Sequence, residues 1–449
     1  MSGLGLVILL SIAIIFIVVS TAKFKLHPFV ALLIAAYGIA LGSGITLDDT
    51  VKTITSGFGG ILAYIGIVIV LGTIIGTILE KTGAAIAMAD YILRKVGRQR
   101  PALAMTIIGY IVSIPVFCDS GFVILSALKK SLAKQTGKSA VTLTVALATG
   151  LYATHTLVPP TPGPIAAAGN LHVDNLGLVI LFGLGISIFT ALAGFAYAQW
   201  IGKRVKSGED EAINLREHDD VRTQYGKLPS TLNAFLPIIV PIALIALASV
   251  VKLLFGKEQS VLLSAIYFLG QPVTALLIGL FFAFRLLPHW NEETLNGWIG
   301  KGVKDAGSIL IITAAGGALG SVLKASGIGD YLGSALQSMS LGILVPFVIA
   351  AALKTAQGSS TTALVVTSTI IYPLLQPLGL ESTIGSILTI MAIGAGAMTV
   401  SHANDSFFWV VAEFSEMDVA TAYKSHTMAT LVQGLVTITI VALLSVVLL

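Results

Sequence analysis

Four ionisable side chains lie in the short polar segments that interrupt long apolar stretches of this chain: Asp119, His155, His402 and Asp405. Groups of this kind are costly to place at membrane depth, and where they occur they commonly handle a proton, an ion or a substrate. His402 and Asp405 are three residues apart, and Asp119 directly follows Cys118. We therefore predict that these four residues take up and release protons as the protein works. Asp119 could also cap the helix that follows it, and both roles can hold together.

The most unusual stretch is GLYATHTLVPPTPGPIAAA, residues 150–168, which has prolines at positions 159, 160, 162 and 164. Proline removes a backbone donor and clashes with the preceding turn, so we expect the helix to stop near Val158 and restart after Pro164. In hydrocarbon such a break persists only where it faces protein or a water-filled cavity. A helix broken at mid-membrane indicates the binding site of a transporter.

Four polar segments at membrane depth hold all the predicted substrate-binding residues. Each segment also starts a new half-helix, whose N-terminal amides favour an anion. The predicted residues are Asp119, Ser120, Gly121, Thr154, His155, Thr156, Thr161, Gly163, Gln357, Gly358, Ser359, Ser360, Thr361, Ser401, His402, Asn404 and Asp405. Because no arginine lies within a predicted span, we expect a carboxylate to be held by amides and by Thr, Ser and Asn side chains.

The composition is that of an integral membrane protein, since 55% of the 449 residues are hydrophobic and 11% are charged. The single cysteine excludes an intramolecular disulfide and a multi-cysteine metal site. A net charge of +4 does not indicate nucleic-acid binding, because the basic residues fall in loops. The first apolar stretch has no Lys or Arg before Lys23, so we interpret it as a retained span and not as a signal peptide.

The apolar segments predict about ten transmembrane helices, two of them broken, and two re-entrant hairpins. The predicted spans are 4–22, 27–43, 59–79, 139–170 (broken), 176–200, 232–254, 260–284, 306–323, 383–408 (broken) and 422–449. The hairpins are 101–128, interrupted at Cys118–Gly121, and 341–378, interrupted at Gln357–Thr362.

Charge distribution favours hairpins over tandem spans in these two segments. With the N-terminus outside and both segments as hairpins, 21 of the 26 Lys and Arg residues fall on the cytoplasmic side. This asymmetry is what the positive-inside rule expects. A single crossing at 101–128 would separate the two basic clusters that flank it. We therefore predict a multi-pass membrane protein with both termini on the outer side, opposite the basic loops.

An internal repeat follows from the same layout. Gly72, Gly76, Leu79 and Gly83 recur 244 positions later as Gly316, Gly320, Leu323 and Gly327. The two copies cross in opposite directions, so the repeats are inverted, as in proteins that work by alternating access. The predicted fold class is an all-α membrane protein built as an inverted-repeat secondary transporter. The predicted units are 1–200, a solvated cytoplasmic linker at 201–230, and 231–449.

The polar segments resemble one known family. The strings VFCDSGFV (116–123), ATHTLVPPTPGP (153–164), QGSSTT (357–362) and SHANDSFFW (401–409) are similar to those of the gluconate:proton symporter (gluconate permease) family, and the resemblance covers nearly the whole chain. It implies bacterial inner-membrane uptake of gluconate or a related sugar acid with protons. Some members of that family carry idonate, glycerate-like acids or D-serine.

The chain departs from the gluconate carriers at three places in the expected pocket. It has Asp119 and Ser120 where those carriers have glutamate and valine, and Thr161 where histidine is common between the prolines. At the second hairpin it has GSST, residues 358–361, in place of GSAT. These differences leave the substrate within the class open.

Several alternatives remain at this point. A sodium-coupled or amino-acid (D-serine-like) symporter of the same fold fits the same segments, because Asp119 or Asp405 could accept an ammonium group. A passive channel fits less well, because an inverted repeat with paired breaks suits alternating access around one site. An intramembrane hydrolase also fits less well, since the chain has neither HExxH nor GxSxG. The expected partners are a small hydroxylated carboxylate, the lipid bilayer and, as one option, a second copy in a homodimer. We expect no enzyme activity, metal or cofactor, with the proton gradient as the energy source.

Overall fold

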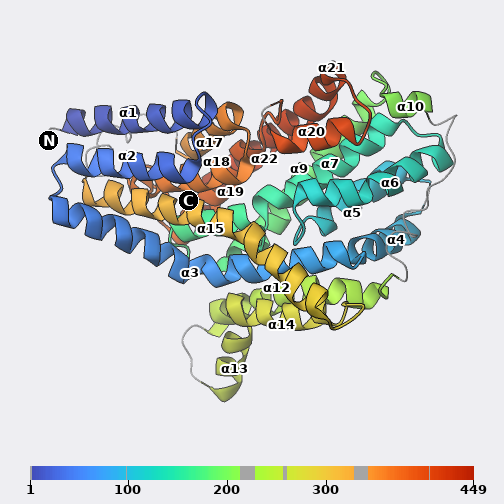
Figure 1. Cartoon of the computed structure of the whole chain (residues 1–449), viewed down its shortest axis with the longest axis horizontal. Helices are drawn as coiled ribbons and strands as arrows, with labels where there is room; N and C mark the ends of the chain where they lie inside the picture. Colours follow the sequence, from blue (N-terminus) through green and yellow to red (C-terminus); the bar gives the residue numbers. More distant parts are fainter. Residues whose placement is uncertain (1–2, 98, 213–227, 256–259, 328–341, 404) are drawn as a thin grey trace.

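The fold is known from a computed structural model that describes residues 3–97, 99–212, 228–255, 260–327, 342–403 and 405–449 (Figure 1). Every regular element in these ranges is a helix, as the composition predicts. Asn404 is the one predicted site residue that lies outside the described residues.

The first half contains ten described helices, and their order follows the predicted spans. They are α1 (Gly3–Ala22), α2 (Pro28–Ser43), α3 (Leu47–Lys81), α4 (Ala84–Val96), α5 (Pro101–Val112), α6 (Cys118–Thr136), α7 (Ala140–Leu157), α8 (Pro162–Asn170), α9 (Leu176–Ile201) and the short α10 (Gly208–Ala212).

The second half adds α-helices and three short π- or 3₁₀-turns, named η. They are α12 (Thr231–Phe255), α13 (Val261–Leu269), α14 (Pro272–Phe284), η1 (Glu293–Trp298), α15 (Ile299–Ala325), α17 (Leu344–Gln357), α18 (Ser360–Ile371), η2 (Tyr372–Leu374), α19 (Thr383–Met398), α20 (Ser406–Glu413), α21 (Val419–Ala422), η3 (Tyr423–Thr427) and α22 (Met428–Leu448).

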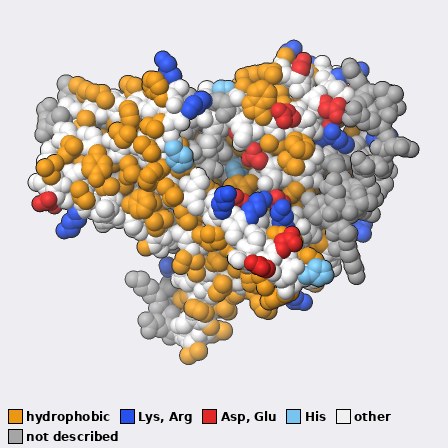
Figure 2. All heavy atoms as spheres, in the orientation of Figure 1, with side chains coloured by type: hydrophobic (Ala, Val, Ile, Leu, Met, Phe, Trp, Pro, Cys, Tyr) orange, Lys and Arg blue, Asp and Glu red, His pale blue; other side chains and the backbone are white. Residues whose placement is uncertain are grey.

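Apolar length alone identifies the membrane-spanning character of the described helices. Five helical stretches are long and apolar enough to cross a membrane, or seven if each of two bent pairs counts as one span. Shorter apolar helices, such as α2, α5 and α17–α19, supply other predicted segments. Large apolar side chains are exposed on α1 and α13, and Figure 2 shows extensive hydrophobic surface over the α1–α3 part of the molecule. Such a surface suits contact with lipid.

Both predicted hairpins and both predicted breaks are present. α5 and α6 form the first hairpin, and α17 and α18 form the second, which turns at Gly358 and Ser359. The first broken helix stops at Leu157, one residue before the predicted position, but restarts at Pro162 and not after Pro164. Proline is tolerated in the first turn of a helix, where its missing N–H has no intrahelical partner, so the restart comes early.

The two halves interlock through these elements. α8, after the first break, packs against α18 of the second hairpin, and α20, after the second break, packs against α6 of the first hairpin. α3 and α15 lie side by side over much of their length (Figure 1). The same exchange in both directions is what an inverted repeat produces. A Cβ atom at Gly150 would collide with the Thr106 carbonyl of the first hairpin, and one at Gly396 with the Phe347 carbonyl of the second.

Two predictions about the surroundings need correction. α3 begins at Leu47 and not at 59, because Thr46 caps it by accepting a hydrogen bond from Asp49 N. The segment after α9 is not solvated throughout: Glu209 is 4% exposed and pairs with the fully buried Lys129 of α6 at 2.9 Å. A carboxylate can be buried when an ammonium group shares the same low-dielectric site, and composition does not reveal that partner.

Candidate functional site

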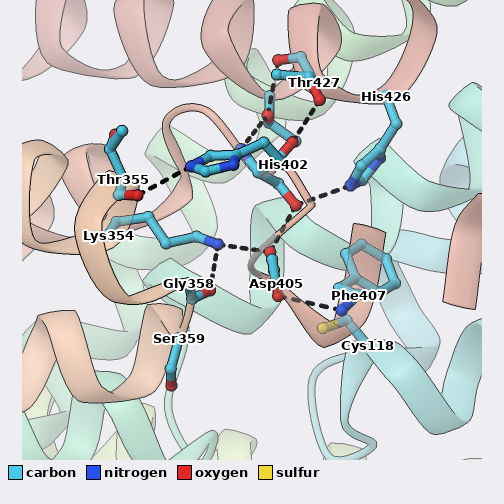
Figure 3. A network of polar contacts seen from close by, with 12 residues as sticks. Cys118, Lys354, Thr355, Gly358, Ser359, His402, Asp405, Phe407, His426 and Thr427 are labelled. Atoms are coloured by element: carbon cyan, nitrogen blue, oxygen red, sulfur yellow. Dashed lines mark hydrogen bonds and ion pairs between the residues drawn. The ribbon is translucent and has the colours of Figure 1, made fainter. Parts of the chain in front are cut away.

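The centre of the candidate site is a buried ion pair between the second hairpin and the second break. Lys354 Nζ lies 2.5 Å from Asp405 Oδ2 and donates a second hydrogen bond of 2.5 Å to the Gly358 carbonyl (Figure 3). Lys354 is fully buried, and Asp405 is 5% exposed. The pair therefore joins the second hairpin to the second break, two of the segments that hold predicted site residues.

Helix ends explain why these groups meet. α17 ends at Gln357 with Gly358 in the left-handed conformation (φ 90°), so Lys354 lies one turn before the negative end of the helix dipole. Asp405 is the N-cap of α20, and its Oδ1 accepts a hydrogen bond of 3.1 Å from Phe407 N. Each charge thus also stabilises the end of its own helix.

Ser401 and His426 extend the cluster on the side of Asp405. Ser401 Oγ donates to Asp405 Oδ2 at 2.5 Å, and His426 Nε2 lies 3.1 Å from the same Oγ. Because the Ser401 hydroxyl proton points to the carboxylate, His426 Nε2 must carry the hydrogen and donate to Ser401. The Ser401 backbone is held by Thr427 and Thr430, with the Thr427 hydroxyl 2.6 Å from the Ser401 carbonyl. This chain of bonds holds the second break in one shape.

The first hairpin brings Asp119 to the same place. Asp119 lies in the first turn of α6, close enough to Asp405 for their charges to interact and within hydrogen-bonding reach of the Ser406 side chain. It is not the N-cap, because Phe117 holds that position without a side-chain cap. Cys118 is 2% exposed and donates to Asp119 Oδ2 at 3.5 Å. Ser120 is half-buried and Gly121 is buried beside Leu151.

The first break contributes aromatic contacts more than polar ones. His155 is buried and stacks on Tyr152, with ring centroids 6.2 Å apart, and Tyr152 contacts Phe407 at 5.2 Å. Gly163 lies against Leu364 of α18. Three threonines of this segment donate to backbone carbonyls: Thr154 to Tyr110, Thr156 to Tyr152, and Thr161 to Val158.

The predicted site residues therefore fall into two groups. Asp119, His155, Ser401 and Asp405 come together, whereas His402 turns away and its Nε2 donates to the Thr355 carbonyl at 2.9 Å (Figure 3). In the second hairpin, Ser359 caps α18 by accepting a hydrogen bond from Thr362 N. Ser360 and Thr361 are the first two residues of that helix. The Gln357 side chain is half-buried, and its Nε2 has no hydrogen-bond partner in the described part of the chain.

Sequence reasoning missed Lys354, Tyr152 and His426. Lys354 had a usable signal, because a lysine within an apolar segment, one turn before a glycine, is unusual enough to be a candidate. His426 had a weaker signal, because it is a histidine inside the predicted span 422–449 but close to the start of that span. Two open cavities of about 600 and 680 Å³ lie elsewhere, beside the loop between α8 and α9, and contain none of the predicted site residues.

Comparison with known proteins decides the family. The sequence profile of the GntP family permeases matches residues 5–447, almost the entire chain. The chain belongs to the GntP permease family. This GntP-family permease is 38% identical to an uncharacterised permease of Haemophilus influenzae over 92% of its own length and 86% of that protein. It is 30% identical to a gluconate permease of Pseudomonas aeruginosa, over 97% of both chains, and 32% identical to the D-serine transporter DsdX of Escherichia coli, over 99% of both.

Solved structures place the permease in a wider fold group. The MtrF transporter of Neisseria gonorrhoeae matches 95% of this chain and 96% of its own, with a TM-score of 0.67 and 16% identity. The YdaH transporter of Alcanivorax borkumensis matches 93% and 98%, with a TM-score of 0.63 and 14% identity. At these identities the likeness concerns the fold alone. The protein is thus a helical membrane transporter of the GntP family.

Proposed function

We propose that this permease imports gluconate or a related small hydroxylated carboxylate by proton symport. The site around Lys354 and Asp405 would open alternately to the two sides of the membrane. The observation that carries the proposal is the charge balance of that cluster. Asp119 and Asp405 supply two carboxylates, and Lys354 supplies one ammonium group. An anionic substrate adds a further negative charge in a poorly solvated place, so entry of the substrate favours entry of a proton with it.

Substrate recognition would use the groups around three helix ends. The N-terminal turns of α6, α18 and α20 lie at the hairpins and the second break, and their amides suit a carboxylate. The hydroxyl groups of Ser120, Ser360 and Thr361 then suit substrate hydroxyls. Both charged partners of the central pair are buried, so a substrate reaches them only if a hairpin or a half-helix moves.

A D-serine-like amino acid is the second candidate, favoured by the 32% identity to DsdX over 99% of both chains. Its ammonium group would need one of the two carboxylates, whereas a sugar acid would not. Asp119 is the better candidate of the two, because Asp405 already binds Lys354.

We place the protein in the bacterial inner membrane, as membership of the family suggests, with both termini in the periplasm, the orientation that the distribution of Lys and Arg favours. Transport by this route involves no covalent chemistry and no cofactor, and a homodimer is compatible with it. Labelling of single cysteines introduced at Ser43 and Lys304, which our topology places on opposite sides, tests the orientation.

The deciding experiment is uptake by purified protein in proteoliposomes under an imposed pH gradient. Labelled gluconate should accumulate against its own gradient and stop accumulating when a protonophore is added. Competition by unlabelled gluconate, idonate, glycerate and D-serine ranks the substrates. Equilibration without accumulation would overturn symport, and failure of every sugar acid to compete with D-serine would replace the substrate class.

A further inference from the structure

We propose that the Lys354 ammonium is a tethered cation that occupies the place of a coupling metal ion, so that this permease works without sodium. The inference rests on the proposed transport function but concerns its ion specificity. It also identifies Lys354 as the residue that decides between proton and sodium coupling, two possibilities that the sequence leaves open.

The ligands of Lys354 are the first argument. Its Nζ contacts one backbone carbonyl, that of Gly358, and one carboxylate oxygen, Oδ2 of Asp405. In transporters with broken helices, carbonyls at unwound positions and the C-terminal ends of half-helices coordinate sodium. The group that holds this position here is an ammonium that belongs to the chain.

The second argument is the reach of the side chain. Gly358 lies four positions after Lys354, so the side chain extends along its own helix to the last turn of α17. Lysine near a helix C-terminus interacts favourably with the final carbonyls and with the dipole. The charge is therefore supplied by the hairpin itself and moves whenever the hairpin moves.

The third argument is that hydration does not explain a lysine at this position. Lys354 is fully buried, so its ammonium group gains no hydration that would favour lysine over an apolar residue. Replacing a buried ion pair by apolar residues is often neutral or stabilising, so stability alone does not account for this one. A charge that neutralises Asp405 in place of a mobile ion does account for it.

Other titratable groups face the pair from the neighbouring helices. α6 contributes Cys118 and Asp119, α7 contributes Tyr152 and His155, and η3 contributes His426. Removal of the ammonium would leave Asp119 and Asp405 as two nearby carboxylates without the cation that now pairs with Asp405. That arrangement attracts a small monovalent cation.

The test compares wild type, Lys354→Ala and the matched exposed-lysine control Lys304→Ala in sodium chloride and in choline chloride of equal ionic strength. Wild type and Lys304→Ala should accumulate substrate equally in both salts. Lys354→Ala should lose proton-driven accumulation. Sodium should raise the rate of substrate counterflow by this variant about tenfold over the rate in choline, the change that about 1.4 kcal/mol of binding free energy produces.

A second measurement does not depend on transport. The melting temperature of Lys354→Ala should rise with sodium and not with choline, because an ion that binds only the folded state stabilises it. The melting temperature of wild type should be the same in both salts. Sodium-dependent uptake by wild type, or a Lys354→Ala variant indifferent to sodium in both assays, would overturn the inference. If wild type transports nothing, the proposed function fails, but the melting experiment still tests the tethered cation.

Discussion

Glu209 and Lys129 form an ion pair, 80 residues apart in sequence, that is buried where the chain leaves the first half of the molecule. Lys129 Nζ also donates to Ser415 Oγ at 2.7 Å, and Asp210 accepts a hydrogen bond from Ala140 N at the start of α7. The beginning of the linker thus ties the first hairpin to the first broken helix and to the turn after α20. Figure 1 shows α10 beside α6 and α7 at one end of the bundle.

We predict that Glu209→Gln destabilises the protein strongly. Removing one partner leaves Lys129 buried with an uncompensated charge, which costs about 3–5 kcal/mol. The double variant Lys129→Met with Glu209→Gln should recover part of the loss. The exposed neighbour Lys130 is the control, and Lys130→Gln should change little. Thermal unfolding in detergent measures all four, and equal melting temperatures for wild type and Glu209→Gln would show that the pair contributes nothing.

Asp119→Asn should abolish proton-driven accumulation while substrate exchange persists. Asparagine keeps the size of the side chain but cannot take up the proton that offsets an anionic substrate. Asp174→Asn, at an exposed carboxylate outside the cluster, is the matched control. Uptake driven by a pH gradient and counterflow at equal pH separate the two activities. Normal gradient-driven uptake by Asp119→Asn would remove this residue from the coupling role.

Asp405→Asn should impair transport more than Ser406→Ala. The first change leaves the Lys354 ammonium buried without its carboxylate, whereas Ser406 is exposed. We expect a loss of at least about a hundredfold in initial uptake rate, the effect of about 3 kcal/mol. Asn404→Ala, at a position outside the described residues, should also weaken uptake. Unchanged kinetics in all three well-expressed variants would make the second break purely structural.

Asn170→Asp tests the contact between the two halves. Asn170 Nδ2, at the end of α8, donates to the Val365 carbonyl and to the hydroxyls of Ser368 and Thr369 in α18. Aspartate has nearly the same shape but no donor, so the buried acceptors lose their partner at a cost of about 1–3 kcal/mol. We expect a lower melting temperature and slower exchange. Asn170→Gln keeps the amide donor and is the control for the position of that donor. A wild-type rate of substrate exchange in Asn170→Asp would show that this contact is not needed for movement of the hairpin.

Cys118 reports on opening of the first hairpin. It is 2% exposed in this conformation, so a maleimide should react slowly, and only when the hairpin tip becomes accessible. Our topology puts that opening on the cytoplasmic side, so a membrane-impermeant maleimide should label inside-out vesicles faster than right-side-out ones. Cys118→Ser provides the background signal. The opposite preference would reverse the predicted orientation.

The breaks and hairpins could be predicted from the sequence because their causes are local. Pro159–Pro164 interrupts a helix wherever it occurs, since proline lacks the N–H that the ladder needs. The inverted repeat was visible in the constant spacing of glycines and polar segments, and the motifs 153–164 and 401–409 pointed to the family. Four of the predicted site residues, Asp119, His155, Ser401 and Asp405, meet in the structure because the repeat places their segments together.

Only the tertiary structure decided which charges share a partner. Lys354 and Asp405 are 51 residues apart, and nothing in their immediate neighbours indicates that one neutralises the other. The same holds for Glu209, whose segment has the composition of a solvated loop, and for His402, which binds the Thr355 carbonyl and not the central cluster. A buried charge is tolerable only beside its counter-charge, and the fold, not the local sequence, places the two within reach.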